Sequence, residues 1–125
     1  MDKRNCLVAL LATACFAVSS LAVAADPVQA RKDLKAMGIE YNEQEFAKAA
    51  GNDDMPAVKL FVDAGMDVNA GGGAAIGVAA GRGKTKMVEF LLSKGAKPTS
   101  AALGYAHTRN HPDIEKILRE AGAKD

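Results

Sequence analysis

Cysteine is scarce in this sequence and is confined to one end of it. The chain has 125 residues and two cysteines, Cys6 and Cys15, both within the first 25 positions. The 100 residues that follow contain none, which excludes a disulfide framework and a cysteine-based metal site in that part of the chain. A stretch of this length is sufficient for one small domain.

A net charge is also lacking once the first 25 residues are set aside. Residues 26–125 carry 14 basic and 14 acidic side chains, and this balance argues against nucleic acid as the partner. The charges are separated along the chain, since residues 26–70 hold five basic and nine acidic groups whereas residues 71–125 hold nine and five. A molecule polarised in this way can orient a partner along its length.

A recognisable catalytic set is absent as well. Ser93 is the one serine between residues 26 and 99, and the pattern places it on a helix. Neither of the two histidines, His107 and His111, has an evident acidic residue to orient it. The paired carboxylates at residues 53–54 lie at the expected start of a helix, where capping and the helix dipole account for them. We therefore expect no enzymatic activity and no cofactor.

The first 25 residues have the layout of a secretory signal peptide. Lys3 and Arg4 form a basic start, and an apolar run over residues 7–18 follows them. Small residues then fit a cleavage site after Ala24 and, nearly as well, after Ala25. This pattern predicts a periplasmic or secreted protein that is free of the membrane after cleavage.

Two other interpretations of the same segment stay open. The apolar stretch of 20 residues from Cys6 to Ala25 is just long enough to span a membrane, so an uncleaved anchor is the first alternative. A lipoprotein signal ending at Cys15 is the second, although Ala12 stands where such signals normally have leucine.

A glycine recurs after short amphipathic segments at nearly constant spacing. The four positions are Gly38, Gly65, Gly95 and Gly122, which lie 27, 30 and 27 residues apart. A period of this size is typical of stacked repeats. Glycine just past a helix supplies the left-handed backbone that ends it. The spacing therefore predicts a solenoid, a fold that functions mainly by presenting a surface.

Each repeat is expected to contain two helices. In the middle copy, the small residues at 74–80 indicate a helix that packs closely, and a breaker follows at residues 81–84. Thr85 is predicted to be the N-cap of a second, largely apolar helix over residues 86–94. The glycines at 71–73 are predicted to form a tight turn between repeats that needs positive φ.

The two ends of the stack differ from its middle. The helix expected over residues 28–37 has no small-residue partner before it, which predicts a half-repeat that covers the N-terminal end. Glu115 and Arg119 stand where the middle copy has Val88 and Leu92, as a repeat without a following neighbour requires. The predicted organisation is an N-terminal half-repeat cap at 26–42, repeats at 43–70 and 71–100, and a C-terminal capping repeat at 101–125.

These residues resemble the ankyrin repeat. The stretches at 49–70 and 79–96 match the family's pattern of paired alanines, an apolar helix and a closing glycine. The resemblance covers residues 28–125 and implies an all-α solenoid of helix-turn-helix repeats that binds other proteins. The family's Thr-Pro-Leu-His opening is absent, and the period is shorter than the usual ~33 residues, which predicts shortened inter-repeat hairpins. Asp53 and Asn110 replace the usual glycine of the turn between helices, whereas Gly83 keeps it.

Three motifs have competing explanations. Residues 77–85 resemble a phosphate-binding loop, but Val78 stands where that motif needs glycine and no strand precedes it. His107 and His111 have the spacing of two metal ligands on a helix, but the repeat pattern puts the second in a turn, so we expect no metal. The basic cluster Arg82, Lys84 and Lys86 fits a solvated turn or recognition of an acidic partner. No aromatic residues interleave with this cluster, which argues against nucleic acid.

The resemblance places binding on the concave surface formed by the first helices and the adjoining turns. Carried over position by position, the exposed slots are Lys48, Asn52, Val78, Arg82, Tyr105 and Arg109. Tyrosine and arginine are the residue types that most often anchor interfaces. The resulting expectation is a non-catalytic adaptor, inhibitor or protective partner of another protein, with an accessory subunit of an envelope enzyme or a stress-protection protein as the alternative.

Overall fold

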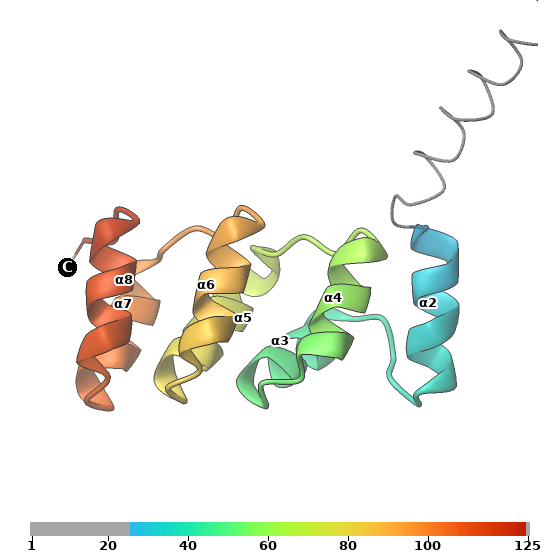
Figure 1. Ribbon diagram of the computed structural model, residues 1–125, viewed down its shortest axis with the longest axis horizontal. Coiled ribbons are helices and arrows are strands. Elements are labelled where there is room, and N and C mark those ends of the chain that lie inside the picture. The colour runs from blue at the N-terminus through green and yellow to red at the C-terminus, as the bar shows by residue number, and fades with distance from the viewer. Residues whose placement is uncertain (1–25, 125) are drawn as a thin grey trace, which may run out of the picture.

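The computed structural model describes residues 26–124 and shows an elongated stack of α-helices (Figure 1). Within that range there are seven helices and no strand. Their bounds are α2 Pro27–Ala36, α3 Glu43–Gly51, α4 Met55–Asp63, α5 Ala70–Gly81, α6 Thr85–Ser93, α7 Ser100–Thr108 and α8 Pro112–Glu120. The predicted all-α solenoid with shortened hairpins is confirmed. The proposed signal peptide and its two alternatives fall on residues 1–25, outside the described residues.

The helices form two rows (Figure 1). The inner row is α3, α5 and α7, in which each helix packs directly on the next. The outer row contains α4, α6 and α8, and α2 packs against α4 at its N-terminal end. Helices α3 and α4, α5 and α6, and α7 and α8 pair as antiparallel hairpins. Helix α2 has no inner-row partner in the described chain, as a half-repeat requires.

Small residues allow the inner helices to approach each other closely. Ala50, Ala79, Ala80 and Ala106 are fully buried. Larger side chains on the outer helices complete the core between the two rows. The largest fully buried side chains are Phe46, Phe61, Leu34, Ile76, Met87, Leu91, Leu103, Ile114, Leu118, Val58 and Val88. No polar or charged side chain among residues 26–124 is buried, so the core is apolar throughout.

The recurring glycines end the outer-row helices. Gly38, Gly65, Gly95 and Gly122 all have positive φ, between 76° and 112°. The residue after each glycine donates its backbone N–H to the carbonyl five positions earlier, at 2.9 Å in every case. This is the Schellman arrangement, in which a left-handed residue lets the chain turn back and satisfy helix carbonyls. The predicted role of the four glycines is confirmed.

The turns between paired helices also need a left-handed residue. Asp53 and Asn110 adopt φ of 60° and 61°, and Gly83 adopts 74°. Aspartate and asparagine tolerate this conformation better than other non-glycine residues. Gly83 has a further reason to be glycine, because a Cβ there would lie 2.7 Å from Cε1 of His111. The imidazole of His111 is therefore packed against the preceding turn.

The helix N-termini are capped differently from one repeat to the next. Oδ1 of Asp54 accepts a hydrogen bond from the backbone N–H of Ala57 at 3.2 Å, as expected of an acidic residue at a helix start. The prediction for Thr85 is wrong. Thr85 is the first residue of α6, Lys84 is the N-cap, and α6 has no side-chain cap. The cap position is one residue earlier than we expected, because Lys84 occupies the place in its repeat that Asp54 occupies in the preceding one.

Three glycines account for the longer middle spacing. Gly71, Gly72 and Gly73 adopt φ of 67°, 70° and 85° with ψ near 28°, which is one turn of left-handed backbone ahead of the regular part of α5. Consecutive left-handed residues are unfavourable for any residue except glycine. The tight turn predicted at this point is confirmed.

Asn69 connects this turn to the next repeat. Its Nδ2 donates to the carbonyl of Gly95 at 3.2 Å, and its Oδ1 accepts from the backbone N–H of Lys97 at 2.7 Å. The residues at the same place in the other repeats, Asn42 and Thr99, instead cap α3 and α7. The three inserted glycines separate Asn69 from the start of the regular helix, which leaves its amide free to bridge two repeats.

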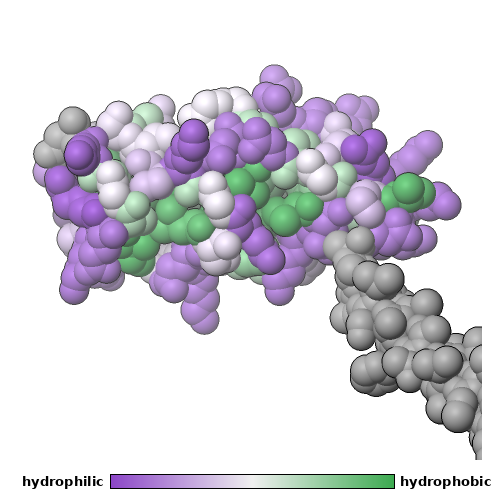
Figure 2. Space-filling model, turned by 90° about the horizontal axis from the view of Figure 1, so that it is seen from above, coloured by the Kyte–Doolittle hydropathy of each residue, from purple (hydrophilic) through white to green (hydrophobic). Residues whose placement is uncertain are grey.

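Apolar atoms reach the surface on the side of the inter-repeat loops. Figure 2 shows a band of apolar residues along the stack, with hydrophilic groups on both edges. None of the helices described between residues 26 and 124 has the length and hydropathy needed to cross a membrane.

Candidate binding surface

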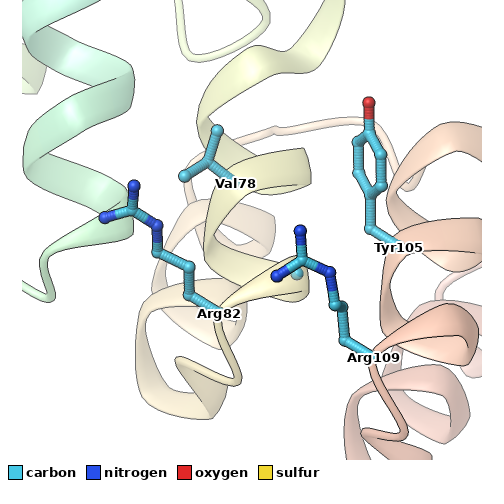
Figure 3. Close-up of a pocket in the computed structure, with 5 residues that line it drawn as sticks. Val78, Arg82, Tyr105 and Arg109 are labelled. Carbon is cyan, nitrogen blue, oxygen red and sulfur yellow. The ribbon is translucent and has the colours of Figure 1, made fainter.

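A hollow opens on the inner row of helices, between α5 and α7. It has a volume of about 320 Å³ and is lined by Val78, Gly81, Arg82, Tyr105 and Arg109. Figure 3 shows Val78 and Arg82 entering it from the α5 side and Tyr105 and Arg109 from the α7 side. Four of the six residues that the sequence singled out therefore lie around one depression.

Tyr105 lies on a surface made of glycine. A Cβ on Gly77 would be 3.5 Å from Cε2 of Tyr105, and one on Gly81 would be 3.4 Å from its Cβ. The absence of side chains on this face of α5 lets the ring approach the helix, while 53% of the residue stays exposed. The phenol is thus held against one helix and presented to solvent, an arrangement typical of interface anchors.

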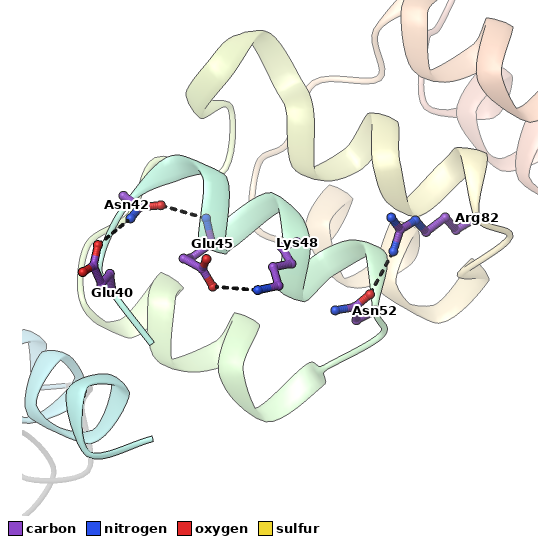
Figure 4. A network of polar contacts seen from close by, with 6 residues as sticks. All are labelled: Glu40, Asn42, Glu45, Lys48, Asn52 and Arg82. Carbon is purple, nitrogen blue, oxygen red and sulfur yellow. Dashed lines mark hydrogen bonds and ion pairs between the residues drawn. The ribbon is translucent and has the colours of Figure 1, made fainter. Parts of the chain in front are cut away.

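The same arrangement recurs one repeat earlier. Gly51 ends α3, and a Cβ there would overlap Cγ1 of Val78 and lie 3.3 Å from Nη1 of Arg82. The Arg82 guanidinium crosses to α3, where Nη1 donates to Oδ1 of Asn52 at 2.8 Å (Figure 4). Glycine at the end of one inner helix therefore makes room for the surface side chains of the next.

The other two predicted residues belong to a second, smaller hollow. Lys48 and Asn52 line a space of about 220 Å³ on the exposed flank of α3. The ammonium of Lys48 lies 3.6 Å from Oε2 of Glu45, and the Lys48 side chain is 65% exposed (Figure 4). The hydrogen bond from Arg82 to Asn52 joins the two hollows into one inner surface.

The charges of the hollow between α5 and α7 are not neutralised within it. No carboxylate lines it. Arg82 bonds to a neutral amide, and across residues 26–124 no hydrogen bond or ion pair involves Arg109. Both arginines are exposed. The depression thus combines two unpaired guanidinium groups with one aromatic ring and one aliphatic side chain.

The two histidines contact different groups. Nδ1 of His107 lies 3.1 Å from Oε1 of Glu115, so our expectation that neither histidine has an orienting acid is wrong for His107. The partner comes from α8, eight positions along the chain, and only the hairpin of α7 and α8 brings it near. His111 is packed against Gly83. Among the described residues there is no group of three histidine, cysteine or acidic side chains that could hold a metal.

The segment that resembles a phosphate-binding loop has structural roles at each of its glycines. Residues 77–85 form the end of α5, the turn and the first residue of α6. Gly77 and Gly81 lie against Tyr105, and Gly83 lies against His111. The sequence reasoning identified the surface residues but missed these glycines as their support. Their recurrence at the ends of the inner helices, at positions 51 and 81, was the available signal.

The comparisons with known proteins agree with the fold. Myotrophin from Xenopus tropicalis, an ankyrin-repeat protein, is 47% identical to this chain over 57 residues. The match covers 43% of this chain and 48% of the relative, so the chain spans about half the length of the curated relative it matches. No protein-family model and no solved structure matches the chain. The two rows of helices and this similarity together give the chain an ankyrin-repeat fold.

Proposed function

We propose that this chain, a helical solenoid of the ankyrin-repeat type, binds another protein through the inner surface formed by α3, α5 and α7. The ankyrin fold of its relative is an interaction fold without catalytic machinery of its own. The observation that carries the proposal is Tyr105, a large ring held on glycine yet half exposed beside two unpaired arginines. Side chains of these types dominate binding energy when a partner covers them.

The compartment and the biological role are part of the same proposal. The basic and apolar pattern of the first 25 residues supports export to the periplasm or the exterior, where the mature chain acts as an adaptor, inhibitor or protective partner. Mass spectrometry of the protein isolated from its source cells tests the export step. An N-terminus at Ala25 or Asp26 supports it, and an intact Met1 in the cytosolic fraction contradicts it.

Affinity capture tests the binding role. The full chain with a C-terminal tag is the bait in an envelope extract, and a second bait carries Arg82→Ala, Tyr105→Ala and Arg109→Ala. A matched control bait carries Lys59→Ala and Lys94→Ala, which remove two cations from the groove between α4 and α6 on the outer row. We expect a partner that the wild type and the control retain and that the inner-surface variant loses. Equal capture by all three baits would contradict the assigned surface.

A further inference from the structure

The chemistry of the hollow between α5 and α7 points to the kind of partner it fits. Its two cations, Arg82 and Arg109, come from the turns after α5 and α7, and no acidic side chain lines the space between them. A guanidinium group presents a planar fork of donors that suits a carboxylate, with two parallel hydrogen bonds where the geometry allows. Two such groups facing one depression favour an anionic ligand.

The other walls of the hollow are not charged. Val78 and the ring of Tyr105 form an apolar side, and Gly81 leaves the backbone accessible between them. An aliphatic side chain can pack against these two residues while carboxylates next to it bind the arginines. A ligand with alternating acidic and aliphatic character therefore satisfies every wall of the depression.

The rest of the inner surface argues for a short acidic segment and against a long polyanion. Residues 26–70 have nine acidic and five basic groups, and Glu43 and Glu45 lie on α3 at the other end of the inner row. A nucleic acid that entered the hollow and continued along the stack would approach this negative end and be repelled. The positive charges also flank a single aromatic ring, not the series of rings on which bases stack.

From this geometry we propose that the hollow binds a short acidic protein segment, with carboxylates on Arg82 and Arg109 and an aliphatic side chain between Val78 and Tyr105. The proposal rests on the proposed function and specifies the partner's chemistry at the same surface. Raised salt weakens such binding, because the ligand's charges are attracted through partly solvated contacts.

The test is an NMR titration of the isotopically labelled full chain with two peptides that differ only in charge. The acidic probe is acetyl-Glu-Glu-Leu-Glu-Glu-amide, and the neutral probe has glutamine in place of each glutamate. We expect the acidic probe to shift the backbone amides of Gly81, Arg82, Tyr105 and Arg109, and to bind at least about tenfold more tightly than the neutral probe. A variant with Arg82→Gln and Arg109→Gln should lose this preference, whereas the outer-row control with Lys59→Gln and Lys94→Gln should keep it.

The outcomes separate the two proposals. If both peptides shift the hollow equally, or if neither binds, the acidic chemistry is wrong while the inner surface can still bind a partner of another kind. If the acidic peptide shifts the outer helices and not the hollow, the assigned surface fails as well. Tighter binding of a single-stranded oligonucleotide at the same amides would reassign the hollow to nucleic acid. A dimer in sedimentation that the arginine variant dissociates would reassign it to a second copy of this chain.

Discussion

Tyr105 of one inner helix packs against Gly81 of the preceding helix, and the position of a Cβ on that glycine would be only 3.4 Å from the tyrosine Cβ. The same relation holds one repeat earlier between Val78 and Gly51, where the fit is closer still. A repeated small residue on one helix and a repeated surface residue on the next therefore build the inner surface together. This regularity makes the surface testable by substitution on either side of the contact.

Substitution of the supporting glycines should give opposite results at two positions. At Gly51 an added methyl group overlaps Cγ1 of Val78, whose β-branched side chain cannot move aside easily. We expect Gly51→Ala to destabilise the protein by about 1–3 kcal/mol. At Gly77 the nearest atom is 3.5 Å away, an ordinary contact, and Gly77→Ala should stabilise the helix by about 0.5–1 kcal/mol. Urea unfolding measures both.

The second substitution at the Gly51 contact provides the control. If overlap with Val78 causes the loss, Gly51→Ala combined with Val78→Ala should recover most of the stability relative to Val78→Ala alone. Equal destabilisation in both backgrounds would mean that the loss arises elsewhere.

Gly83 and Gly95 should respond unequally to the same change. Both have positive φ, so alanine at either position adopts a left-handed conformation at a cost of about 1–2 kcal/mol. At Gly95 nothing lies within 4 Å of the new methyl group, whereas at Gly83 it would meet the ring of His111. We expect Gly83→Ala to lower the melting temperature more than Gly95→Ala does. The difference should shrink when His111→Ala is also present, and an unchanged difference would contradict the contact.

The helix caps give a third comparison. Asp54→Ala removes the acceptor for the N–H of Ala57 and should destabilise the protein by about 1 kcal/mol. Thr85→Ala removes no side-chain cap, because α6 has none, and we expect little change in the urea midpoint. A loss for Thr85→Ala as large as that for Asp54→Ala would restore threonine as the cap that the sequence suggested.

Asn69 should matter more than an ordinary loop asparagine. It makes two hydrogen bonds to the next repeat, each contributing about 0.5–1.5 kcal/mol. Asn69→Asp keeps the acceptor for Lys97 but places a carboxylate oxygen against the carbonyl of Gly95, so it should destabilise the protein. Hydrogen exchange at the Lys97 amide checks the bridge directly. Protection that is unchanged in Asn69→Ala would show that the bridge does not hold this loop.

The sequence predicted the fold well because the repeat is encoded locally. The glycines at 38, 65, 95 and 122 and the left-handed Asp53 and Asn110 each act within one turn, so spacing alone located them. The cap of α6 was placed one residue too late because threonine is a strong cap former and lysine is not, which made local preference misleading. Local preference failed where the position within the repeat decided.

The candidate surface was predicted in part. Position within the repeat located Val78, Arg82, Tyr105 and Arg109, which the fold brings around one hollow. It did not show that Lys48 and Asn52 belong to a separate depression, or that Glu115 meets His107. These relations depend on how neighbouring repeats are offset in space, and no short stretch of sequence records that offset.

Site-specific photo-cross-linking tests the central claim most directly. A photoreactive phenylalanine analogue replaces Tyr105 in the full chain, and in a matched protein it replaces Lys59 on the outer row. After irradiation in an envelope extract, the account predicts one discrete cross-linked protein from position 105 that is absent from position 59 and is lost when Arg82→Ala and Arg109→Ala are added. The same product from both positions, or none from position 105 while position 59 gives one, would contradict binding through the inner surface.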